Sequence, residues 1–266
     1  MPISTASQVR VCDRETFHEI DREVTGLAFC IQNEFGRYLD ESVYQRELFR
    51  RCTDSGLEVV REYPMTVSLD DFAKCYFADL MINNAVIVET KAAETLAQPH
   101  VAQTLNYLFL CGLHHGTLLN FRSTRVEHQF VSTSITPRDR HTYEIRKAHW
   151  RPLSAECNRL YTTVSRLLAE WGAYLDLVLY REGLVHFLGG SERIEREVAI
   201  YSRETAIGSQ SMTLLTDEIA FSLTSATRDP HLVAEHQQRL LAHTRLRALH
   251  WINFNRQVIT IQTITP

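Results

Sequence analysis

Lysine is nearly missing from this chain of 266 residues, which has only Lys74, Lys91 and Lys147 among its 28 basic residues. The formal net charge is −4, so overall charge does not by itself indicate a nucleic-acid binder. Long apolar runs are missing too, since no stretch approaches the ~20 apolar residues of a membrane span. Met1–Glu15 lacks the apolar core of a signal peptide. We therefore expect a cytoplasmic protein with no membrane partner.

Metal-binding and disulfide spacings are absent as well. The six cysteines form no C-x-x-C pair, and the twelve histidines form no H-E-x-x-H pattern. Several cysteines lie in apolar periodic stretches, which favours buried, reduced thiols over disulfides or a zinc site. The remaining composition is that of a globular protein, and its length allows one large domain or two small ones.

The first half alternates helical and strand patterns. Apolar residues three or four apart predict an amphipathic helix over Phe17–Phe35. Alternating apolar stretches separated by turn residues predict strands, with a tight turn at Asn83-Asn84. The expected elements are helices at 17–35, 41–53 and 99–111, and strands at 57–67, 72–82, 85–90, 115–121 and near 126–133. The order is therefore α-α-β-β-β-α-β, with a further strand at the end.

The second half repeats the pattern of the first. The segment Trp171–Leu184 aligns with Phe35–Leu48, and Ile252–Phe254 aligns with Leu119–Phe121. Because the offset drifts only from 136 to 133 residues, we interpret the match as a tandem duplication. Chance similarity between two α/β segments is the alternative. The predicted parts are a first domain at 14–136, a basic linker at 137–152 and a second domain at 153–266.

Asp79, Glu89 and Lys91 are the residues best suited to chemistry. Residues two apart on a strand point to the same face, so Glu89 and Lys91 are expected to lie together near Asp79. Two carboxylates and the backbone carbonyl of Thr90 offer the hard oxygen ligands that Mg²⁺ prefers. Such an ion lowers the pKa of a bound water and offsets charge on a phosphodiester. An ion pair on an exposed strand is the alternative reading of this triplet.

The use of lysine at position 91 favours the functional interpretation. In a chain that otherwise uses arginine, it indicates a need for a compact ammonium group beside a metal. Gln103 and Tyr107 lie four apart on the following helix and share a face that can reach a phosphate or position Lys91. Glu41 opens an earlier helix and can add a third carboxylate. A helix-face hydrogen bond and a charge favoured by the helix dipole are the simpler alternatives.

These motifs together are similar to those of a known family. They are Phe35-Gly36…Glu41-Ser42-Val43-Tyr44, Phe77-Ala78-Asp79-Leu80, Val88-Glu89-Thr90-Lys91-Ala92, Gln103…Tyr107 and Leu118-Leu119-Asn120-Phe121. From about Ile20 to Val131 the chain resembles the GxxExxY proteins, small members of the PD-(D/E)XK nuclease superfamily. One departure is that Tyr38 stands where the family has its namesake glycine.

The resemblance implies an α/β (α+β) fold, the αβββαβ core of restriction-endonuclease-like proteins, with a mixed central sheet flanked by helices. It implies that Asp79 and Glu89 are metal ligands and that Lys91 is the catalytic lysine. Gln103 and Tyr107 correspond to the RecB-like helix motif, and Glu41 corresponds to the first-helix glutamate.

The second copy lacks this chemistry. Alignment from Asn120 and Asn253 gives the replacements Asp79 to Met212, Glu89 to Ser222, Lys91 to Thr224, Gln103 to His236 and Tyr107 to Leu240, and Leu177 replaces Glu41. Without hard anionic ligands this half cannot hold magnesium in the same way. We therefore expect a pseudo-nuclease domain that packs on the first, completes a pseudo-twofold or extends a DNA track.

Positive charge gathers near the predicted boundary between the halves. Between Arg122 and Arg151 there are seven basic residues against three acidic ones, which suggests a phosphate-contacting patch. Its candidate nucleic-acid-binding residues are Arg138, Arg140, Arg146, Lys147 and Arg151. A solvated linker that never meets substrate is the alternative.

The sequence thus predicts a nuclease that depends on Mg²⁺, with Mn²⁺ able to substitute, and that acts on DNA in preference to RNA. Catalysis is expected at one site in the N-terminal half. The alternative is a catalytically silent nucleic-acid-binding or scaffolding protein that kept the nuclease fold. The oligomeric state stays open, because an internal pseudo-dimer can take the place of a homodimer.

Overall fold

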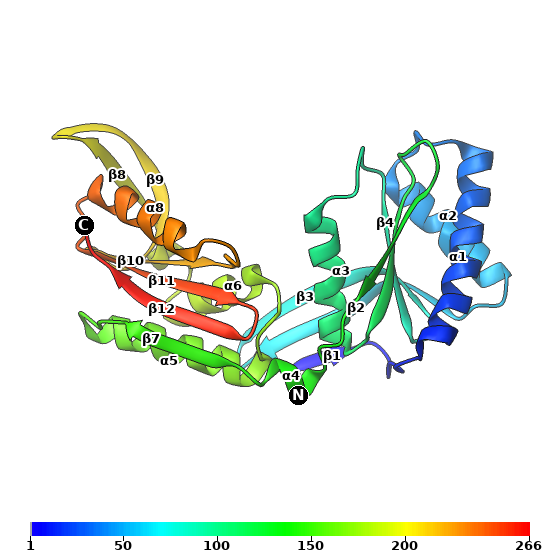
Figure 1. Ribbon diagram of the computed structural model, residues 1–266, viewed down its shortest axis with the longest axis horizontal. Helices are drawn as coiled ribbons and strands as arrows, with labels where there is room; N and C mark the ends of the chain where they lie inside the picture. The colour runs from blue at the N-terminus through cyan, green and yellow to red at the C-terminus, as the bar shows by residue number, and fades with distance from the viewer. Residues whose placement is uncertain (1) are drawn as a thin grey trace. The chain divides into compact units, whose positions relative to one another are not determined.

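The computed structural model describes residues 2–266, which divide into two compact units, Met1–Arg138 and Asp139–Pro266. Within these described residues, each unit contains one mixed sheet of six strands flanked by helices (Figure 1). No helix of the described chain combines the length and apolar character that crossing a membrane requires. The predicted α/β class is confirmed, and the cytoplasmic location stays a prediction.

The first unit contains the expected helices and strands in the expected order. Its strands are β1 (Ile3–Thr5), β2 (Val59–Leu69), β3 (Phe72–Ile82), β4 (Val86–Lys91), β5 (His115–Asn120) and β6 (Glu127–Ser132), and its helices are α1 (Arg14–Phe35), α2 (Glu41–Asp54) and α3 (Gln98–Cys111). The strand order is β1-β2-β3-β4-β5-β6. Strands β4 and β5 run parallel around α3, and the other neighbours run antiparallel. Only the short strand β1 was not foreseen.

Local sequence signals explain where these elements begin and end. The Asp13 side chain accepts a hydrogen bond from Thr16 N at 2.8 Å and caps the start of α1. Asn83 and Asn84 both have positive φ, 52° and 54°, as a two-residue hairpin turn with the twist of the flanking strands requires. Asparagine tolerates this region better than most residues, so the predicted tight turn between β3 and β4 is confirmed.

The core of the first unit decides which way the strand side chains point. The apolar stripe of α1 packs together with α2 on Leu80, Val88 and Leu119, which are fully buried. Successive side chains on a strand point to opposite faces of the sheet. The other face from Val88 therefore receives Ile87, Glu89 and Lys91. Helix α3 covers that other side (Figure 1). Glu89 and Lys91 therefore share the α3 face, as predicted.

The second unit has a sheet of the same general plan. Its strands are β7 (Glu144–His149), β8 (Glu195–Ser202), β9 (Thr205–Thr216), β10 (Ile219–Thr224), β11 (Ala248–Asn255) and β12 (Val258–Ile264). Its helices are α5 (Ala155–Trp171), α6 (Leu177–Leu188), α7 (Ser191–Ile194) and α8 (Pro230–Ala242), and α4 (Pro137–Arg140) spans the boundary between the units. The strand order is β7-β12-β11-β10-β9-β8.

The predicted linker at 137–152 is wrong over most of its length. Residues 144–149 form β7, which pairs in parallel with β12 through Glu144↔Val258 and Arg146↔Thr260. The boundary between the compact units falls earlier, between Arg138 and Asp139. Charged side chains are common on edge strands, where they discourage pairing with other chains. The charge that suggested a linker was therefore compatible with a strand.

The two sheets share their central topology. Strands β2 to β6 and strands β8 to β12 follow the same order, with one parallel pair, β4/β5 or β10/β11, at the same place. The extra strand differs, since β1 extends the first sheet beside β2 and β7 extends the second beside β12. The parallel ladders also share a register, because Lys91 pairs with Asn120 and Thr224 pairs with Asn253.

Candidate active site

The site forms where strands β3 and β4 separate. Their backbone pairing runs from Ile82↔Val86 to Leu80↔Val88. Beyond it, the backbone N–H groups of the two strands donate to carboxylate side chains instead of to backbone carbonyls. The backbone N–H of Asp79 donates to Glu89 Oε1 at 2.9 Å, and the N–H of Thr90 donates to Asp79 Oδ2 at 2.7 Å. This exchange fixes both carboxylates between the ends of two rigid strands.

Further donors orient the Asp79 carboxylate. The Thr90 hydroxyl donates to Oδ2 at 2.8 Å, and Gln45 Nε2 on α2 donates to Oδ1 at 3.0 Å. Gln45 is a buried polar residue that sequence reasoning missed. Its signal was its position four residues after Glu41, on the same helix face as a predicted site residue.

Lys91 lies between two carboxylates. Its Nζ is 3.4 Å from Glu89 Oε2 and 3.7 Å from Glu41 Oε1. The other oxygen of Glu41 accepts a hydrogen bond from Ala92 N at 3.1 Å. Glu89 is 1% exposed and Lys91 9% exposed, so this is not the exposed ion pair of the alternative reading. The ammonium is fixed at the mouth of the site by α2 and β4 together.

The buried charges influence one another strongly. Burial, followed by the negative charge of Asp79, raises the pKa of Glu89 to about 8, although Lys91 opposes the shift. Burial tends to lower the pKa of Lys91, but the carboxylates of Glu89, Asp79 and Glu41 outweigh it and raise the pKa, so the ammonium keeps its charge. A divalent cation beside Asp79 and Glu89 would offset the repulsion between them.

Helix α3 contributes the side chains predicted for it. Gln103 Nε2 donates to the Tyr107 hydroxyl at 2.8 Å, which confirms that the two residues share a helix face. Tyr107 is buried, and burial raises the pKa of its phenol, with the charges of Glu89, Lys91 and Asp79 also acting on it. The neutral phenol therefore lies within the electrostatic reach of the site.

The donor chemistry of the site fits a magnesium ion. Among residues 2–266, no group of three or more His, Cys, Asp or Glu side chains is arranged to hold a metal. The carboxylates of Asp79 and Glu89 with the Thr90 carbonyl are hard oxygen donors, and Mg²⁺ usually completes its shell with water. Glu41 is occupied by Lys91 and Ala92 N, so its role as a third ligand stays a prediction.

A comparison with protein families finds a match for part of the first unit. The model of the PD-(D/E)XK nuclease superfamily matches residues 18–132. The match contains Asp79, Glu89 and Lys91, and the mixed sheet flanked by helices is consistent with a PD-(D/E)XK-like fold. The match ends before the second unit. Searches of curated proteins and of solved structures found no match.

The second unit has no charged residues at the positions equivalent to Asp79, Glu89 and Lys91. Its ladders pair Ser222 with Trp251 and Phe221 with Thr213. The first unit pairs Glu89 with Leu118 and Val88 with Leu80, one residue after Asp79. The equivalent ladder positions are Asp79 and Met212, Glu89 and Ser222, and Lys91 and Thr224. An apolar thioether and two hydroxyls stand where the first unit has its charges.

The predicted basic patch is not a single surface. Arg140 is 5% exposed, and its Nη1 donates to the Trp171 carbonyl at 3.3 Å, at the C-terminal end of α5. Burial lowers the pKa of this guanidinium. The prediction that Arg140 binds nucleic acid is therefore wrong, because the side chain is enclosed by the second unit and interacts with the carbonyl end of a helix.

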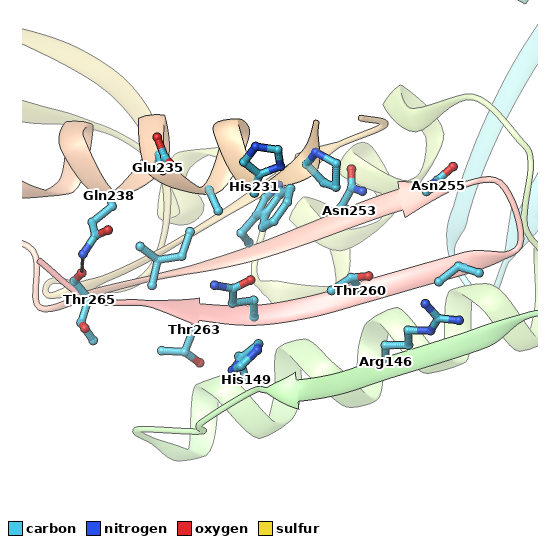
Figure 2. A pocket seen from close by; sticks show the side chains of 16 residues that line it. Arg146, His149, His231, Glu235, Gln238, Asn253, Asn255, Thr260, Thr263 and Thr265 are labelled. Carbon is cyan, nitrogen blue, oxygen red and sulfur yellow. Dashed lines mark hydrogen bonds between the residues drawn. The ribbon is translucent and has the colours of Figure 1, made fainter. Parts of the chain in front are cut away.

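Arg146 and Lys147, the two predicted residues on β7, face different sides of the sheet. Arg146 and His149 line a groove of about 640 Å³ between α8 and the sheet (Figure 2). Lys147 instead lies over the Tyr161 ring of α5, at 4.7 Å from its centre. Arg146 also forms an ion pair with Glu144 at 2.9 Å. Nucleic-acid contacts by Arg138, Arg146, Lys147 and Arg151 stay predictions.

Proposed function

We propose that the first unit is a metal-dependent nuclease that hydrolyses phosphodiester bonds of DNA, in preference to RNA. The observation that carries this proposal is the pairing of Glu89 and Lys91 on the α3 face of β4, beside Asp79 at the split between β3 and β4. The superfamily match over residues 18–132 supports it, because metal-dependent nucleases are usual in that superfamily. We assign the unit to the GxxExxY group within it.

Some residues of the site would bind the metal, and others would act on the phosphate or the attacking water. Asp79, Glu89 and the carbonyl of Thr90 would hold Mg²⁺ or Mn²⁺, and the bound ion supplies a water of lowered pKa and a Lewis acid for the phosphate. Lys91 keeps its charge at neutral pH and orients that water or stabilises the charge that develops on the phosphate. Gln103 and Tyr107 position the phosphate group from α3.

Two residues support the site without contacting the substrate. Glu41 fixes the Lys91 ammonium and the backbone at Ala92. Gln45 fixes one oxygen of Asp79. Because a displacement of about 1 Å in a catalytic group can cost about 100-fold in rate, both are positioning residues with a measurable contribution.

We infer that the second unit is a duplicated copy that has lost this chemistry. Its shared strand order and ladder register support a common origin. With Met212 and Ser222 in place of the two carboxylates, it has no anionic ligands for magnesium at that position. The protein would then have one catalytic site per chain.

The test is a cleavage assay with Mg²⁺ or Mn²⁺ on single-stranded, duplex and circular DNA and on RNA. The wild-type chain should cleave, and Asp79→Asn should not. Asp217→Asn is the matched control, because that carboxylate is exposed and pairs only with Arg196 among the contacts of the described chain. Binding of DNA without cleavage under any metal condition would favour the silent binding protein instead.

A further inference from the structure

A pocket occupies the place in the second unit where the first unit has its carboxylates. It has a volume of about 220 Å³ and is lined by Met212 on β9, Ser222 on β10 and Leu240 on α8. By ladder register, Met212 and Ser222 are the equivalents of Asp79 and Glu89. The pocket therefore opens at the same split between strands.

Two of the side chains that line this space are shorter than their counterparts in the first unit. Ser222 replaces a glutamate, and Leu240 aligns with Tyr107, whose buried ring fills this region of the first unit. Replacing a large side chain by a smaller one leaves room when the surrounding backbone keeps its position. The shared strand register indicates that the backbone frame has been kept.

The lining of the pocket combines apolar side chains with several hydrogen-bonding groups. Met212 and Leu240 supply apolar surface, while Gln210 and Gln237 supply amides that both donate and accept. Within residues 2–266, the Ser222 hydroxyl is buried and has no hydrogen-bond partner. That oxygen is closed off from solvent, so the amides of Gln210 and Gln237 are the polar groups that can reach a ligand.

The charges around the pocket make divalent cations and phosphates poor ligands for it. Among the described residues that line it, none is an aspartate or glutamate, so it cannot attract a divalent cation. Arg181 lines the pocket, but its guanidinium already lies 2.8 Å from Glu195, which weakens its hold on a phosphate. A neutral, planar ligand with apolar faces and a polar edge fits this chemistry better.

We propose that this pocket binds a nucleobase. Met212 and Leu240 contact the faces of the ring, and Gln210 and Gln237 bond to its polar edge, since an amide can pair with a base edge through two hydrogen bonds. The pocket is smaller than the ~300–1,000 Å³ that drug-sized ligands occupy, which suits one base with part of its sugar. The choice of a nucleobase rests on the proposed nuclease function. The second unit would then hold a base of the strand without cleaving it.

Methionine methyl resonances offer a direct test in the full-length protein. The chain has four methionines, and Met65 and Met81 are fully buried in the first unit. With methyl-¹³C-methionine labelling, titration with adenosine, guanosine, cytidine and thymidine should shift the Met212 signal, because an aromatic ring alters nearby resonances. Ribose 5-phosphate, which has no base, should leave that signal in place. The expected dissociation constant is about 0.1–1 mM.

Substitutions on one helix separate the pocket from the rest of the unit. Leu240→Phe refills the space and should weaken nucleoside binding at least about tenfold, a change of about 1.4 kcal/mol. Leu232→Phe is the matched control, because Leu232 is exposed on the same helix and does not line the pocket. Gln237→Leu removes an amide of the lining at similar size and should also weaken binding, so it tests the pocket if Leu240→Phe does not fold.

The outcomes distinguish this proposal from the nuclease assignment. A Met212 signal that ignores every nucleoside, or that moves equally with ribose 5-phosphate, overturns the base pocket whatever the cleavage assay shows. An Asp79→Asn protein should keep the Met212 response while losing cleavage. If the wild-type chain never cleaves but Met212 still responds, the nuclease proposal fails and the base pocket stands.

Discussion

The two units share the order and register of their central strands and differ in the side chains that those strands carry. In the first unit, Asn120 at the end of β5 bonds to both backbone groups of Ala93, at 2.8 and 3.1 Å. In the second unit, Asn253 at the end of β11 bonds to both backbone groups of Ala226, at 2.9 and 2.8 Å. The same pair of hydrogen bonds holds the loop that follows the central strand in each unit, whether or not that strand carries charged residues.

A second shared feature lies in the helical layer. The Tyr44 hydroxyl donates to the Gly36 carbonyl at 2.7 Å, and the Tyr180 hydroxyl donates to the Gly172 carbonyl at 2.5 Å. Each glycine ends a helix with positive φ, 74° and 78°. The residues that hold these backbone positions are therefore shared by both units, while the charged residues are not. A shared fold is in this sense independent of a shared chemistry.

The largest expected effect is the loss of cleavage when the charged residues of the first unit are changed. Glu89→Gln and Lys91→Ala should each lower the rate about a thousandfold or more, because each removes a group acting directly at the metal or the phosphate. Circular dichroism and thermal unfolding should show an intact fold. The Glu89→Gln protein should unfold no earlier than the wild type, because an uncharged amide replaces a buried carboxylate.

Asp217→Asn provides the comparison for these variants, since it changes an exposed carboxylate of the second unit. A Lys91→Ala protein that cleaves at the wild-type rate, in a preparation free of contaminating nuclease, would show that the catalytic site lies elsewhere. Loss of cleavage in Asp217→Asn as well would show that the assay reports folding instead of chemistry.

The next largest effect concerns a buried pair that differs between the units. In the first unit Thr117 donates to Asp21, and at the equivalent ladder position of the second unit His250 lies 3.0 Å from Cys157 Sγ. Burial lowers the pKa of His250 to about 4. The unfolded chain binds this proton first as pH falls, so the second unit should lose stability progressively from about pH 6.5 to pH 4.

The loss should reach roughly 3 kcal/mol at the acid end of that window, because each unit of pKa corresponds to about 1.4 kcal/mol. Urea unfolding at a series of pH values measures it. His250→Thr, which copies the first unit, should remove most of the pH dependence. An equally steep dependence in His250→Thr would assign the effect to other groups.

Removing the shared tyrosine hydroxyl should have a smaller effect. Tyr44→Phe and Tyr180→Phe each leave a glycine carbonyl without its partner, which costs about 1–3 kcal/mol. If the units have equivalent frames, the two losses should agree within about 0.5 kcal/mol. Chemical denaturation of each variant checks this. A large loss at Tyr44 with none at Tyr180 would mean that only the first unit depends on this bond.

Most helices, strands and turns of the first unit were predictable because the sequence patterns that specify them are local. The apolar periodicity of Phe17–Phe35, the Asn83-Asn84 turn and the alternation along β4 each depend on a few neighbouring residues. The burial of Arg140 was not predictable, because it depends on the end of α5, 31 residues further along the chain. Strand β7 was missed since its partner β12 is more than a hundred residues away, and no local pattern records that pairing.

The smallest expected effect concerns the remaining basic residues, and it tests whether the second unit meets the nucleic-acid backbone. Arg146 lines the groove beside α8, and Arg151 is exposed shortly after β7. Each phosphate contact contributes about −0.9 to the slope of log affinity against log salt on duplex DNA, or about −0.7 on single strands. The double variant Arg146→Ala/Arg151→Ala should therefore flatten that slope by roughly one to two units. Binding should weaken alike for all sequences, because phosphate contacts carry no base information.

Arg50→Ala is the comparison for this last experiment, because that residue is exposed on α2 and paired with Glu47 and Asp54. Removing it changes the net charge without touching the groove, so it isolates the long-range effect of charge on the slope. If the double variant and the wild type give the same slope and affinity, the groove residues make no phosphate contacts. The two units would then differ more clearly. Contacts to the nucleic-acid backbone would be confined to the first unit, and the second unit would bind nucleic acid through the base pocket alone.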